Sequence, residues 1–184
     1  MSETIWVYGY HGTSMDRASA IVKTGFNPSN NEYDWLGKGI YFWQDAPKRA
    51  WQWAQSTHPN NPAVVKSRLK LDRSCLDLLD IGYSPLLKTM YNGFITSYTQ
   101  QNLTLPQQNP DRSKAHRLDS AFFNYVVKTF NSSSDYRIDS IRSAFIEGDR
   151  IFPSSAIYDL THIQIAILDS SLIEELCILT MDDI

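Results

Sequence analysis

Three short segments of the chain carry polar residues that could bind and cleave a small molecule. The first is Tyr10-His11-Gly12-Thr13, at the end of an aromatic and β-branched run that predicts a strand over residues 5–10. A neutral imidazole at a strand end can hydrogen-bond a sugar hydroxyl, and the glycine beside it lets a ligand approach the backbone. The alternative is a structural histidine that precedes a turn.

The second segment is Trp35-Leu36-Gly37-Lys38-Gly39-Ile40-Tyr41-Phe42. Gly37 and Gly39 bracket Lys38 and permit a tight turn before a strand predicted over residues 39–43. Successive residues of a strand point to opposite faces, so one of Tyr41 and Phe42 can face a cleft while the other faces the core. The alternative is an ordinary turn that enters a strand with a core tyrosine.

The third segment, Thr161-His162-Ile163-Gln164-Ile165-Ala166-Ile167, alternates in the manner of a half-buried strand. Its isoleucines share one face, which we expect in the core. His162, Gln164 and Ala166 share the other face, which therefore looks into a cleft or at solvent.

The remaining pattern predicts the elements that must position these segments. Helices are expected between Ser14 and Gly25, over 47–56, from 84–85 to about residue 98, and over 118–130. Further strands are expected over 64–71, 75–79, 140–146, 161–168 and 175–180, with a loop over 26–35 and a polar surface connection over 99–114. Strands at both ends of the chain with helices between them predict an α+β fold.

Composition limits the classes of protein to consider. The chain has 184 residues, expected to form a single domain over 1–184; 42% are hydrophobic and the formal net charge is −3. This weak charge argues against a general nucleic-acid coat, although a local basic surface stays open. With no run of 18 apolar residues and no signal-peptide pattern, we expect a cytoplasmic protein with no membrane contact. Cys75 and Cys177 are expected to be buried packing residues, and no spacing predicts a metal site.

Taken together, the three segments resemble the ADP-ribosyltransferase superfamily, in its diphtheria-toxin and poly-ADP-ribose-polymerase branch. "YHGTS", "SNNEYDWLGKGIYFW" and "RAWQWA" are similar to the first two motifs of that branch and cover about residues 8–56. "HIQIAI" is similar to the third motif, but Gln164 stands where the His-Tyr-Glu triad has its glutamate. This is the pattern of a bacterial His-Tyr-Gln variant. Residues 57–140 carry no motif of the family.

The resemblance implies a split antiparallel β-sandwich that holds NAD, as co-substrate, in a cleft. It places His11, Gly12, Thr13, Tyr41 and Trp53 against NAD. His11 would bond the adenosine ribose, Gly12 would offer its backbone to the nicotinamide, and Tyr41 would stack on that ring. For the second ring of the sandwich, Trp51 and Trp53 both stay open. Trp53 is preferred because it shares a helix face with the small Ala50.

By the same resemblance, the catalytic residues would be His11, Tyr41 and Gln164. Because an amide supplies no charge, Glu147 is the further carboxylate expected near the cleft. The implied function is a mono-ADP-ribosyltransferase that modifies a macromolecule, protein or nucleic acid, as a toxin or defence effector with a possible antitoxin partner. The loop 149–160 would help to choose the acceptor. A pseudo-enzyme that binds NAD or ADP-ribose, and an NAD glycohydrolase, are the alternatives.

Overall fold

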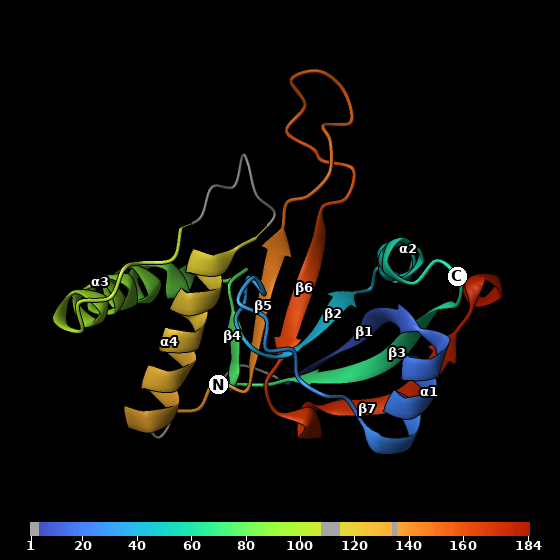
Figure 1. The fold of residues 1–184 in the computed structure, drawn as a ribbon, viewed down its shortest axis with the longest axis horizontal. Coiled ribbons are helices and arrows are strands. Elements are labelled where there is room, and N and C mark those ends of the chain that lie inside the picture. Colours follow the sequence, from blue (N-terminus) through green and yellow to red (C-terminus); the bar gives the residue numbers. More distant parts are fainter. Residues whose placement is uncertain (1–3, 108–114, 134–135) are drawn as a thin grey trace.

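A single hydrogen-bonded sheet organises the part of the chain that the structure describes. The computed structural model describes residues 4–107, 115–133 and 136–184 (Figure 1). Within them, seven strands are ordered β4-β5-β6-β2-β1-β3-β7. The strands are β1 (Ile5–Ser14), β2 (Ile40–Gln44), β3 (Pro62–Leu71), β4 (Cys75–Asp77), β5 (Ser140–Phe145), β6 (His162–Ile167) and β7 (Ile173–Leu179). Neighbouring strands are antiparallel except β4 and β5, which are parallel.

The sheet consists of two halves that meet at β1 and β2. These strands share only the pairs Gly9–Gln44 and Tyr10–Trp43, whereas β1 and β3 pair along their whole length. In Figure 1, β5 and β6 stand nearly upright, while β1, β3 and β7 run nearly horizontally to their right. The pairing of β1 with β2 therefore does not continue past Tyr10, and we call this break in the ladder the split.

The described chain has four helices: α1 (Met15–Thr24), α2 (Pro47–Thr57), α3 (Ser84–Gln100) and α4 (Arg117–Ser133). The α1, α2 and α4 helices pack on the sheet, whereas α3 lies on the outer side of α4 (Figure 1). Local signals set their ends. The Ser14 hydroxyl accepts a hydrogen bond from the backbone N–H of Arg17, and Gly25 ends α1 at a φ of 85°. Pro47 begins α2, as its fixed φ favours.

The two faces of the sheet carry different cores. On one face, Phe42, Ile165 and Ile167 pack in a cluster with the inner residues of β3, and α1 covers the neighbouring part. On the other face, Ala166 and Ile141 pack with the apolar side of α4. The α2 helix lies on this second face at the β1–β3 half, through Ala50 and Trp51.

The structure confirms the α+β class and the order of elements, and it corrects several details. The first strand continues beyond Tyr10 to Ser14 because β3 pairs with it there. The strand at Cys75 ends at Asp77, whose carboxylate turns the chain by accepting from the Leu79 N–H. Cys75 is buried as expected, but Cys177 is exposed. Helix α3 extends into the expected 99–114 connection, of which residues 108–114 lie outside the described residues.

Candidate functional site

His11 lies on β1 at the split. Its Nδ1 donates to the backbone carbonyl of Tyr41 at 2.9 Å, which ties the two strands where their ladder has ended. Burial lowers the pKa of His11, so the ring is neutral near pH 7. Because the carbonyl can only accept, Nδ1 carries the proton and Nε2 is left as an acceptor. A ligand hydroxyl is the natural donor to such a nitrogen.

Gly12 and Thr13 are both buried, at 3% exposure for Thr13. A Cβ placed on Gly12 would lie 2.2 Å from the carbonyl oxygen of Ala50, so the space beside this glycine is filled by α2. Gly12 thus allows a helix to pack against the strand. On its Cβ side, therefore, Gly12 leaves no room for a ligand.

Tyr41 is held by its own turn. Its hydroxyl donates to the carbonyl of Gly37 at 2.7 Å and accepts from the N–H of Leu36 at 2.9 Å. Burial raises the pKa of Tyr41, so the phenol stays protonated. Its ring packs at the edge of the cluster beneath α4, which makes Tyr41 a support of the turn as well as a candidate for ring stacking.

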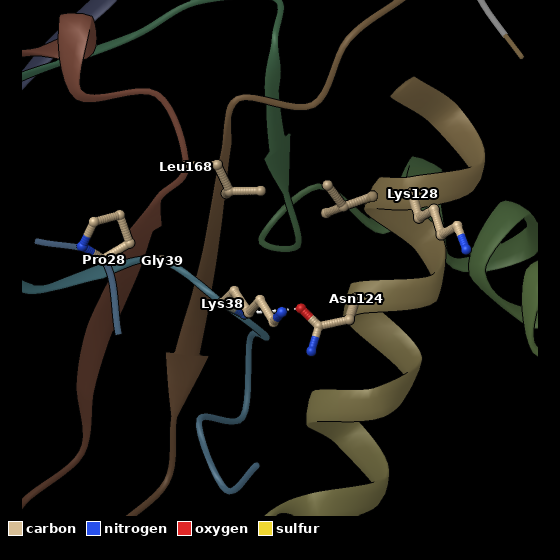
Figure 2. Close-up of a pocket in the computed structure, with 7 residues that line it drawn as sticks. Pro28, Lys38, Gly39, Asn124, Lys128 and Leu168 are labelled. Atoms are coloured by element: carbon tan, nitrogen blue, oxygen red, sulfur yellow. Dashed lines mark hydrogen bonds between the residues drawn. The ribbon is translucent and has the colours of Figure 1, made fainter. Parts of the chain in front are cut away.

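The turn is also fixed to α4. The backbone N–H of Lys38 donates to Oδ1 of Asn124 at 2.9 Å, and Gly37 has a φ of 81°. Figure 2 shows the cavity beside this contact, where Lys38 and Asn124 face each other and Pro28 and Leu168 form the apolar wall. None of His11, Tyr41, Gln164 and Glu147 lines this cavity.

Gln164 lies in the middle of β6, paired with Trp43 on β2 and Ser143 on β5. Its Oε1 accepts a hydrogen bond from the indole N–H of Trp35. Because the indole can only donate, this contact fixes the orientation of the amide. Gln164 therefore presents its NH₂ group, a donor, where a glutamate would present a second acceptor.

Glu147 belongs to a polar cluster that links α2 to the end of β5. Its Oε2 lies 2.6 Å from the guanidinium of Arg49 and 4.0 Å from Nδ1 of His162. Burial and Arg49 lower the pKa of His162, against the opposing effect of Glu147 and of the Leu160 carbonyl. The sequence predicted Glu147 near the site but did not single out Arg49, although "RAWQWA" contains it.

Three buried polar atoms near this cluster have no hydrogen-bond partner within the described residues: Trp43 Nε1, Arg49 Nε and His162 Nε2. The side chains are neighbours, because the guanidinium lies 5.6 Å from the Trp43 ring and the ring centres of Trp43 and His162 are 6.1 Å apart. Buried polar groups usually have partners, so this concentration of unpaired atoms points to a ligand or to ordered water.

Trp51 and Trp53 have different environments. Trp51 is 8% exposed and packs in the core with Ala50 and Val64. Trp53 is 44% exposed, and its ring centre lies 5.9 Å from that of Trp43. Of the two, Trp53 is the one available to a ligand.

The structure brings most, but not all, of the predicted residues to one face. Strand alternation and pairing place the Tyr41, Trp43, Gln164 and His162 side chains on the face that carries α2 and α4. The His11 ring contacts Phe26 and Phe42, which belong to the opposite face. A ligand that contacts both His11 and Gln164 must therefore lie along the split.

The chain is similar to a distant archaeal protein. No family model matches the chain. Over 143 residues the chain is 27% identical to the uncharacterized protein MJ0359 of Methanocaldococcus jannaschii; the match covers 74% of this chain. The chain spans 63% of the length of that relative. Within the described residues, no helix has the length and apolar character needed to cross a membrane, and no group of three or more His, Cys, Asp or Glu side chains could hold a metal ion.

Proposed function

We propose that the protein is an NAD-dependent mono-ADP-ribosyltransferase with an ADP-ribosyltransferase-like split sheet. One observation carries the proposal. His11, Tyr41 and Gln164, far apart in the sequence, lie on the successive strands β1, β2 and β6, and His11 is hydrogen-bonded to Tyr41 across the split. The three segments share an explanation if one extended ligand lies along that split.

The residues present fit such a ligand by their chemistry. The neutral His11 ring offers Nε2 to a ribose hydroxyl, and the exposed face of Trp53 beside Trp43 offers a surface for a flat ring. The unpaired atoms of Trp43, Arg49 and His162 are buried, so a ligand can bond to them only if the side chains around them move. A Cβ on Gly12 would meet Ala50 of α2, so the nicotinamide contact expected at Gly12 can involve only its backbone N–H and carbonyl.

The orientation of Gln164 bears on which reaction this site supports. Cleavage of the bond between nicotinamide and ribose develops positive charge on the sugar, which a carboxylate stabilises better than an amide. Gln164 can orient a ribose oxygen through its NH₂ group but cannot accept a proton from an incoming hydroxyl. Glu147 is the carboxylate in the neighbouring cluster. We therefore favour transfer of a single ADP-ribose over chain elongation.

The proposal is tested by incubating the protein with cell extract and NAD labelled in the adenylate part, and by measuring released nicotinamide and labelled macromolecule together. Gln164→Ala should lower the rate of both by about a hundredfold or more, the usual cost of one transition-state contact. Gln55→Ala removes an exposed amide on α2 and serves as the matched control. Labelled macromolecule supports the proposal.

The alternative functions give different products in the same assay. Free ADP-ribose without labelled macromolecule would identify a glycohydrolase, and unchanged NAD with measurable binding would identify a binding protein. Either result refutes the transferase. A role as a cytoplasmic toxin or defence effector, and an antitoxin partner, are part of the proposal and would be tested by expression of the active protein and of Gln164→Ala in cells.

A further inference from the structure

An exposed strip of alternating aromatic and basic side chains crosses the β1–β3 half of the sheet, outside the candidate site. Three aromatic residues on β1 face three cations on β3 in register: Trp6 opposite Lys70, Tyr8 opposite Arg68, and Tyr10 opposite Lys66. Trp6 and Tyr8 are 40% and 43% exposed, so both rings are accessible. We call these six residues the aromatic–basic strip.

The strip is built on a rigid base. The alternate residues of β3, Ser67, Leu69 and Leu71, point to the opposite face and are at most 2% exposed. The α2 helix covers the strip's own face only from Tyr10 onward, where Tyr10 packs with Trp43 and Trp51. Trp6 and Tyr8 are therefore not covered by α2.

Two cations of β3 form cation–π contacts with rings of β1. The ammonium of Lys66 lies 4.1 Å from the centre of the Tyr8 ring, and the guanidinium of Arg68 lies 4.2 Å from the centre of the Trp6 ring. Each cation thus covers the ring diagonally across from it, a distance that long side chains bridge in antiparallel strands. Aromatic rings and positively charged groups therefore alternate along the strip.

Three acidic residues lie beside these cations. Glu174 on β7 pairs in register with Arg68, and its charge acts on the guanidinium. Glu175 on β7 pairs with Arg68 at 2.9 Å, and Asp72 lies 3.5 Å from Lys70. Lys66 has no ion pair within the described residues. Because the Arg68–Glu175 pair is exposed on both sides, with side chains 38% and 55% accessible, it can be exchanged for another anion at little cost.

We infer that the aromatic–basic strip binds single-stranded nucleic acid. Aromatic residues two apart on a strand are separated by about 7 Å, which lets each ring take one unstacked base. Arg68 adds a planar cation on which a base can stack, and the lysines reach the phosphates. A protein partner fits less well, because the strip's outward side chains are rings and cations with no aliphatic side chain among them. The inference stands independently of any NAD chemistry.

The direct test is fluorescence anisotropy with labelled single strands of RNA and of DNA, about 12 nucleotides long, and with the matching duplexes. Single strands should bind better than duplexes. Trp6→Ala and Tyr8→Ala should each weaken binding by about tenfold, the usual effect of losing one stacked base. Tyr8→Phe keeps the ring and should bind normally. Tyr33→Ala removes a ring that is 53% exposed outside the strip and should have no effect.

Variants of the charged residues give a second test, in which one substitution should weaken binding and another should strengthen it. Lys66→Gln should weaken binding and reduce its salt dependence, whereas Lys23→Gln on α1 should do neither. Glu175→Gln removes the carboxylate that competes for Arg68 and should strengthen binding. Cys177, exposed and paired with Lys66 across β3 and β7, provides an independent probe, because a bound strand should slow its reaction with a thiol reagent.

Several results would overturn the inference. Absence of binding to both single strands would do so, as would a surface that binds a protein instead. So would equal affinity for duplexes, which would indicate charge without stacking. Unchanged affinity in folded Trp6→Ala and Tyr8→Ala proteins would also exclude the strip as the binding surface.

Discussion

Gly12→Ala tests whether α2 packs against β1 as tightly as the structure shows. The added Cβ would meet the carbonyl oxygen of Ala50 at 2.2 Å and the backbone nitrogen of Ala54 at 3.3 Å. Both are backbone atoms of one helix, so no side-chain rotation can relieve the contact. The helix must retreat by about 1 Å to restore an ordinary separation, which disturbs its packing on Trp43 and Val64.

The expected cost follows from two opposing effects. Forcing one extra methyl group into a packed core costs about 1–3 kcal/mol. Replacing glycine by alanine recovers about 0.4–1 kcal/mol by restricting the unfolded chain. The net loss should therefore be about 1–2 kcal/mol, which lowers the melting temperature of a domain of this size by about 2–8 °C.

The matched control is Gly93→Ala in α3. Its Cβ would meet only the hydroxyl of Tyr125, at 2.9 Å, which lies at the far end of a side chain that can swing aside. Alanine is also the better helix former by about 1 kcal/mol, so this variant should be neutral or more stable. Urea unfolding of the two variants measures both changes. If Gly12→Ala is as stable as the parent protein, α2 does not pack on Gly12 and the glycine is free to meet a ligand.

Three further changes are expected from contacts in the site. Tyr41→Phe leaves the N–H of Leu36 without its acceptor and should reduce stability by about 1–2 kcal/mol in urea unfolding, whereas Tyr33→Phe should not; equal stability of the two variants would contradict the contact. The pKa of His11 and of His162 is lowered by burial from 6.5, so the unfolded chain binds more protons below that pH. Stability should then be constant above about pH 7 and fall as the pH drops below about 6.5, and a pH-independent urea midpoint over that range would refute the burial of both rings. Glu147→Gln removes the carboxylate that raises the pKa of His162, so that pKa should fall further; NMR titration of the imidazole measures it, and an unchanged value would show that Glu147 and His162 do not interact.

Local signals in the sequence predicted local structure well. Ser14, Gly25 and Pro47 mark the ends of α1 and the start of α2 as expected, because each acts within one turn of its own position. Alternation along β6 correctly separates the isoleucines from His162 and Gln164, because the period of a strand is fixed by its backbone. The expectation that this second face looks into a cleft or at solvent is wrong for Ala166 and His162, which are buried because helices cover that face too.

The parts of the site that depend on distant contacts could not be predicted. The hydrogen bond from Trp35 to Gln164 joins residues 129 positions apart, and the pair of Arg49 and Glu147 joins residues 98 apart. The contact at Gly12 also depends on a residue distant in the sequence. The sequence shows that a side chain is missing there, but only the fold shows that Ala50 fills the space.

The proposed nucleic-acid strip and the proposed NAD site both include residues of β1, but different ones. Mutations can therefore separate the two activities. Trp6 and Tyr8 occupy the open face of β1, whereas His11, farther along the same strand, lies at the split. Trp6→Ala should therefore lose affinity for single-stranded nucleic acid and still release nicotinamide from NAD at the normal rate. Gln164→Ala should do the reverse, because Gln164 lies on β6 and outside the strip. If either variant loses both properties while remaining folded, the strip and the split are parts of one site, and the separation argued from the sheet register is wrong.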